Sequence, residues 1–161
     1  RPKKLASSKA TLIDVSRHIL KHVFKNSLKN LIVLQPTSPL RSFKDINNSI
    51  RLFKKTKADF VTTLTMAKPS SWYKKIHKKS ILKNYVKPNE ITTQNNENNY
   101  VLNGAVFIFS KNFLMNYYLK KKSFKMYGYV MPKNRSIDID DIYDLNLVRL
   151  LINSKKNLIK K

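Results

Sequence analysis

Acidic residues are scarce in this chain and concentrated in one place. The sequence holds nine Asp and Glu residues, and four of them lie between Asp138 and Asp144. In Ser136-Ile137-Asp138-Ile139-Asp140 polar and apolar side chains alternate, which predicts a strand with both carboxylates on one face. Two carboxylates that converge at a strand end suit a hard divalent cation such as Mg²⁺. Helix capping is the alternative, and it accounts for Asp141 and Asp144 but not for Asp138.

A second polar segment follows a short apolar run. Residues 31–34 predict a buried strand, and Gln35-Pro36-Thr37-Ser38-Pro39-Leu40-Arg41 ends it. The prolines stiffen this loop, the hydroxyls and the amide of Gln35 can hydrogen-bond a ligand, and Arg41 can pair with a phosphate or carboxylate. A rigid strand-to-helix turn capped by Ser42 is the alternative.

One of the two glycines follows an asparagine inside a strand pattern, at Asn103-Gly104. Asn-Gly is usually a hairpin turn. Because the apolar run continues beyond Gly104, a β-bulge or the close approach of a ligand is a comparable interpretation.

Helices and strands alternate along the chain and must position these residues. The patterns predict helices over 11–29, 42–55, 111–119 and 141–152, and strands over 31–34, 58–65, 101–109 and 126–131. Residues 66–99 read as a loop-rich excursion. Thr11 with Asp14, and Ser42 with Asp45, predict capping boxes. We expect one α/β domain over residues 1–161, with a mainly parallel sheet flanked by helices, and ligands beyond the carboxyl ends of its strands.

Composition limits the function classes. A hydrophobic content of 42% fits a globular domain, the absence of cysteine excludes disulfides and thiolate metal sites, and no apolar run is long enough for a membrane span. We see no secretory signal and expect a cytoplasmic protein. The net charge of +24 makes a nucleic-acid-binding module the alternative class. The abundance of Lys, Asn and Ile is typical of AT-rich coding sequence, however, and explains this charge without a nucleic-acid partner.

In order and spacing, four motifs resemble the acylneuraminate cytidylyltransferase (CMP-sialic acid synthetase) family over almost the whole chain. Residues 1–6, RPKKLA, are similar to the family's RPxxLA segment, and residues 34–41, LQPTSPLR, with Asp45-Ile46, are similar to its LQPTSPLR…DI motif. Tyr100 with residues 103–105 is similar to its Y…NGA strand. Residues 135–140, with Asp144 beyond them, resemble its SIDID…D motif. Each motif is moderately specific, and four in this order support the family strongly.

The resemblance implies a Rossmann-like, GT-A-type nucleotidyltransferase fold and a homodimer, with the dimer contact in an excursion included in residues 67–135. It implies transfer of CMP from CTP to the anomeric hydroxyl of a sialic-acid-type, nine-carbon α-keto acid sugar, with release of pyrophosphate. Positioning and charge neutralisation dominate such a transfer. The family's roles fall on six residues here: catalysis and Mg²⁺ binding on Asp138 and Asp140, substrate binding on Gln35 and Asn103, and nucleotide binding on Arg1 and Ala10. We predict substrate binding for Arg41 as well, because its guanidinium can pair with a phosphate or carboxylate.

Three departures from the family pattern affect these expectations. The family's phosphate-binding loop lies upstream of the position that matches Arg1, so we expect an N-terminally truncated fragment that is inactive on its own. An inactive remnant of the enzyme is a further alternative. Ser8 stands where the family usually has Asp. Thr93 stands where many members have an arginine for the sugar carboxylate. A legionaminic- or pseudaminic-type sugar is therefore an alternative substrate.

Overall fold

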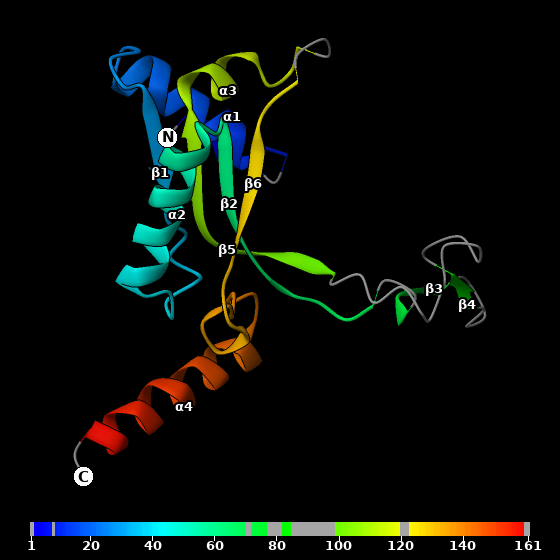
Figure 1. Ribbon diagram of the computed structural model, residues 1–161. Coiled ribbons are helices and arrows are strands. Elements are labelled where there is room, and N and C mark those ends of the chain that lie inside the picture. Colours follow the sequence, from blue (N-terminus) through cyan, green and yellow to red (C-terminus); the bar gives the residue numbers. More distant parts are fainter. Residues whose placement is uncertain are drawn as a thin grey trace.

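A four-stranded mixed sheet forms the centre of the protein (Figure 1). The computed structural model describes residues 2–7, 9–69, 72–76, 82–84, 99–119 and 123–159. The strand order is β1 (Asn30–Val33), β5 (Tyr100–Ser110), β2 (Phe60–Met66) and β6 (Met126–Val130). Strand β5 pairs antiparallel with both β1 and β2, whereas β2 and β6 are parallel.

The α/β class is confirmed, but the expected mainly parallel sheet is corrected to a mixed one. Helix α2 (Phe43–Thr56) joins β1 to β2, and these two strands run in the same direction, as the helix–strand alternation predicts. They are not neighbours, because β5 lies between them. The chain leaves the sheet at the carboxyl end of β2 and re-enters it at the same end, so β5 runs back antiparallel to β2.

Helices cover both faces of the sheet. Helix α2 packs Ile46, Ile50 and Phe53 against a core that includes Val106 and Ile108 of β5. The opposite core combines β5 residues Phe107 and Phe109 with apolar residues of α1 (Leu12–His18), of the π-helix Ile19–Val23 and of α3 (Lys111–Asn116). Successive residues of β5 therefore serve opposite cores, as the two-residue period of a strand requires.

The sequence predicts where the helices start more accurately than where they end. Both predicted capping boxes are confirmed, Thr11 with Asp14 for α1 and Ser42 with Asp45 for α2. The first helix is shorter than predicted, because the π-helix ends at Val23 and the chain then turns through positive φ at Lys25 and Asn26. Helix α4 (Ile142–Ile159) is longer than predicted.

The remaining described elements lie outside the sheet. The 3-10 helix Lys3–Ala6 precedes α1, and the 3-10 helix Lys133–Arg135 follows β6. In the excursion, β3 (Lys74–Ile76) and β4 (Leu82–Asn84) form a separate two-stranded sheet, which Figure 1 shows away from the centre. Helix α4 also extends away from the sheet (Figure 1). Within the described ranges, no helix is long and apolar enough to cross a membrane.

Candidate active site

The predicted site residues of three motifs meet at the carboxyl ends of the parallel strands. The loop after β1 and the segment after β6 both start at this end of the sheet, and Figure 1 shows α4 leaving from it, opposite α1 and α3. Ligands of open α/β sheets bind at such an end. The part of β5 around Asn103 and Gly104 lies at this same end of the sheet.

Gly104 lies in a bulge of β5 and not in a hairpin turn. Between Thr62 and Leu64 of β2, the partners on β5 change from Phe107 to Leu102, so β5 carries extra residues there. Gly104 adopts a φ of +71°, which a residue with a Cβ rarely adopts. The bulge interpretation of Asn103-Gly104 is confirmed.

Because Gly104 has no side chain, two polar groups fit beside it. A Cβ built at Gly104 would lie 2.6 Å from Oε1 of Gln35 and 2.8 Å from Oδ2 of Asp138. These distances are shorter than ordinary van der Waals contact, so the glycine is required for this arrangement. Gln35, Gly104 and Asp138 therefore form one cluster, which we call the Gly104 cluster.

Two contacts join the 35–41 loop to the acid segment. Ser38 is fully buried, and its hydroxyl lies 3.2 Å from the carbonyl oxygen of Asn103 and 3.3 Å from Oδ1 of Asp138. The backbone N–H of Ile139 donates to the carbonyl oxygen of Thr37 at 2.8 Å. The loop thus holds the acid segment through a side chain and through the backbone.

The amide of Asn103 is engaged inside the protein. Its Nδ2 donates to Oγ of Ser136 at 2.9 Å and contacts the sulfur of Met131 at 3.4 Å, and its Oδ1 accepts from the N–H of Ala105 at 3.3 Å. The residue is 3% exposed. The contact with a sugar that the resemblance implies for Asn103 stays a prediction.

Arg41 shapes the loop. Its Nη1 donates to the carbonyl oxygens of Gln35, Ser38 and Ala105. Burial lowers the pKa of its guanidinium from the ordinary value. These contacts favour the rigid-turn interpretation of the loop, and substrate binding by Arg41 stays a prediction.

The four clustered acids divide into two groups. Oδ1 of Asp141 accepts from the N–H groups of Tyr143 and Asp144 at 2.8 and 3.0 Å, so Asp141 caps α4 as predicted. Asp144 accepts from the N–H of Asp140 at 3.1 Å. Asp138 is half-buried against Gly104, and Asp140 is exposed.

The strand predicted at residues 136–140 is wrong. No strand forms there, because the N–H groups of Ile139 and Asp140 donate to a loop carbonyl and to a carboxylate instead of a neighbouring strand. Among the residues that the structure describes, no group of three or more His, Cys, Asp or Glu side chains is placed to hold a metal ion.

An ion pair beside the cluster was not predicted from the sequence. Arg135 donates from Nη2 and Nε to the two carboxylate oxygens of Asp45, at 2.8 and 2.9 Å. Asp45 is fully buried, and its burial raises the pKa, but hydrogen bonds from Arg135 and Ser42 outweigh this effect and lower the pKa to about 2. The sequence marks Asp45 as a member of the capping box and of the DI motif but gives no sign of a partner such as Arg135.

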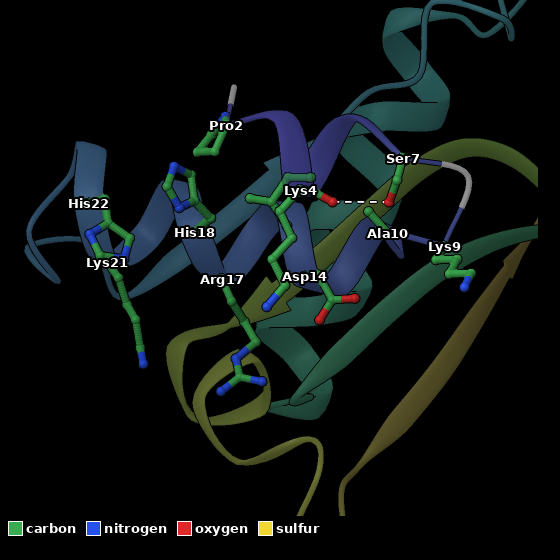
Figure 2. A pocket seen from close by; sticks show the side chains of 11 residues that line it. Pro2, Lys4, Ser7, Lys9, Ala10, Asp14, Arg17, His18, Lys21 and His22 are labelled. Atoms are coloured by element: carbon green, nitrogen blue, oxygen red, sulfur yellow. Dashed lines mark hydrogen bonds between the residues drawn. The ribbon is translucent and has the colours of Figure 1, made fainter.

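A separate basic pocket of about 610 Å³ lies along α1 (Figure 2). Its lining includes Ala10, one of the two predicted nucleotide-binding residues, and the cations Lys4, Lys9, Arg17 and Lys21, which the sequence did not single out. No recorded contact of the described residues joins this pocket to the Gly104 cluster. The other predicted nucleotide-binding residue, Arg1, and the departures Ser8 and Thr93 lie outside the described residues.

The fold and the cluster define an α/β protein with polar side chains gathered at the carboxyl ends of its parallel strands. Comparison with curated proteins finds 32% identity to the N-acylneuraminate cytidylyltransferase of Escherichia coli O18:K1:H7, over 98% of this chain and 37% of that protein. It also finds 28% identity to post-translational flagellin modification protein B of Campylobacter coli, over 96% of this chain and 67% of that protein. These likenesses support the resemblance of the chain to the acylneuraminate cytidylyltransferase family.

The family models give no match to this chain. The chain spans 37% of the length of the Escherichia coli relative.

Proposed function

We propose that this chain carries the sugar- and metal-binding part of a cytidylyltransferase, which transfers CMP from CTP to the anomeric hydroxyl of a sialic-acid-type sugar and releases pyrophosphate. The observation that carries the proposal is the Gly104 cluster, in which Gln35 and Asp138 both lie against Gly104 although they are 103 positions apart in the sequence. The named activity of the Escherichia coli relative supports the same reaction class.

The donor chemistry of the cluster fits Mg²⁺. The ion prefers oxygen ligands, and in nucleotide sites it is usually held by one or two carboxylates, substrate phosphates and water. Asp138 and the exposed Asp140 supply two carboxylates at the same end of the sheet. We assign both residues to Mg²⁺, which would neutralise charge on the triphosphate when bound.

The protein's own residues orient the substrate. Gln35 presents its amide beside Gly104, and the glycine leaves space for the groups that approach it. Arg41 and Ser38 fix the loop that carries Gln35. We propose that Asn103 contributes to sugar binding, and that Arg1 and Ala10 lie beside the nucleotide. A homodimer with its contact in the 67–135 excursion, and a cytoplasmic location, complete the proposal.

The test is pyrophosphate release by the full-length protein that the gene encodes. The assay contains CTP, Mg²⁺ and N-acetylneuraminic, legionaminic or pseudaminic acid in turn. Release with one sugar establishes the reaction and names the substrate. Asp138→Asn should lower the rate by about 100-fold or more, because it removes charge from the site.

The matched control is Asp141→Asn, since asparagine also caps helices well and the acid lies three positions away. This variant should retain the wild-type rate within a few-fold. Wild-type turnover by a folded Asp138→Asn variant would refute the metal assignment. No release with any sugar from folded wild-type protein would refute the proposed reaction.

A further inference from the structure

The Asp45–Arg135 ion pair joins two segments that are far apart in the sequence. The guanidinium makes two parallel hydrogen bonds to the carboxylate, at 2.8 and 2.9 Å. Such bidentate pairs fix orientation as well as distance. Asp45 is fully buried, whereas the side chain of Arg135 is 26% exposed.

The Asp45 side of the pair is anchored firmly. Its Oδ2 also accepts from the N–H and the hydroxyl of Ser42, at 2.8 and 2.7 Å, in the capping box of α2. Helix α2 is packed on the sheet through Ile46 and Ile50 of its next two turns. Asp45 is therefore fixed relative to β5, which carries Gly104.

On the other side of the pair, Arg135 ends the 3-10 helix Lys133–Arg135 and leads into a segment with no regular structure of its own. Residues 136–140 form neither a helix nor a strand, and Arg135 precedes Asp138 by three positions. The segment is held from outside by Asn103 on Ser136, by Thr37 on Ile139 and by Ser38 on Asp138. The ion pair adds the fixed point at its start.

We infer that Arg135 is a positioning residue, which uses buried Asp45 as its anchor to hold the acid segment so that Asp138 faces Gln35 across Gly104. Arg135 and Asp45 act through the backbone and make no recorded contact with the Gly104 cluster. The expected effect of Arg135 on metal affinity rests on the proposed function. Its expected effect on how firmly residues 136–140 are held does not.

The first experiment measures hydrogen exchange at the backbone amide of Ile139 in the full-length protein, because this amide reports the contact between the acid segment and the loop. Arg135→Met should speed its exchange by about tenfold or more through local opening. The amide of Val106, which donates to Thr63 in the bulge, should keep its wild-type rate. Lys133→Met is the matched control, since it removes an exposed cation from the same 3-10 helix.

The second experiment measures Mn²⁺ affinity by electron paramagnetic resonance, without nucleotide or turnover. Arg135→Met should weaken binding by roughly tenfold, the lower end of the losses seen when groups supporting metal ligands are removed. Arg135→Lys should fall between the wild type and Arg135→Met, because lysine supplies the charge but not the two-pronged geometry. Lys133→Met should bind as the wild type does.

The outcomes separate this inference from the proposed function. Unchanged exchange at Ile139 in folded Arg135→Met overturns the inference, and so does faster exchange with unchanged Mn²⁺ affinity. If the wild-type protein binds no Mn²⁺, the metal assignment fails, and the exchange result alone decides the inference. If Arg135→Met does not fold, Asp45→Asn combined with Arg135→Met removes the unpaired buried charge. That double variant must then show fast exchange at Ile139, and wild-type exchange in it overturns the inference.

Discussion

Acid should lower the free energy of unfolding of this protein by protonating Asp45. In the folded protein, burial raises the pKa of Asp45, but hydrogen bonds from Arg135 and Ser42 and the charge of Arg135 lower it from 3.8 to about 2. A carboxylate whose pKa is lower in the folded state stabilises the fold above its unfolded pKa. This contribution is lost as the pH falls from about 4 towards 2.

The size of the effect follows from the pKa difference. Each pKa unit corresponds to about 1.36 kcal/mol, so the lowering contributes about 2 kcal/mol to the free energy of unfolding at neutral pH. Asp45 is fully buried, and solvent therefore screens its ion pair less than it screens a surface pair. A loss of about 2 kcal/mol is a large fraction of the stability of an ordinary domain.

The assay is urea unfolding of the wild type and of Asp45→Asn at a series of pH values from neutral to acid. The wild type should be more stable at neutral pH, and the difference between the two proteins should shrink by about 2 kcal/mol across the acid range. Asp14→Asn is the matched control, because Asp14 occupies the same capping-box position in α1 but its hydrogen bonds are exposed. A wild-type advantage over Asp45→Asn that stays constant down to pH 2 would refute the assignment of this pKa to the ion pair.

Three further predictions concern the cluster and the charge. Gly104→Ala should push Gln35 or Asp138 out of place and weaken Mn²⁺ binding. Gly128→Ala is the control: its Cβ would clash with a methyl carbon of Leu64, so it should lower the free energy of unfolding in urea but keep the Mn²⁺ affinity. Arg41→Met should cost about 1–3 kcal/mol in urea unfolding, because three carbonyl oxygens lose their donor, and a changed KM with full stability would contradict this role. Binding of this +24 chain to a DNA duplex should weaken by about 1,000-fold or more between 50 and 200 mM salt in a fluorescence titration, and sequence-specific binding at the higher salt would favour the nucleic-acid alternative.

The sequence predicted the members of the cluster because each lies in a locally readable pattern. Gln35 follows an apolar run that ends at prolines, and Gly104 interrupts a strand after an asparagine. Asp138 lies among acids too numerous for capping alone. The direction of β5 was not predictable in the same way, because it depends on where the 66–99 excursion returns to the sheet and not on any residue within the strand.

Two features that the sequence did not predict, the ion pair and the irregular form of residues 136–140, have a common physical cause. The ion pair joins residues 90 positions apart, and the capping-box pattern around Asp45 gives no sign of a second partner. The alternation in residues 136–140 indicates a strand only if a neighbouring strand is available to receive its hydrogen bonds. Here a loop carbonyl and a carboxylate receive them. Local patterns thus pointed to the residues that lie together in the Gly104 cluster, and long-range contacts decided how they are held.

The scarcity of acids is the reason for our choice of Asp138 and Asp140 as the proposed metal ligands. The structure describes seven of the nine acids, and five of these accept recorded hydrogen bonds that fix element ends or connections: Asp14, Asp45, Asp59, Asp141 and Asp144. Asp138 has a recorded contact with one hydroxyl, that of Ser38, and its other oxygen faces Gly104. Asp140 is exposed. Asp138 and Asp140 are therefore the two described acids left for another role, and their place after β6, at the carboxyl ends of the parallel strands, is the reason why we propose them as ligands of Mg²⁺.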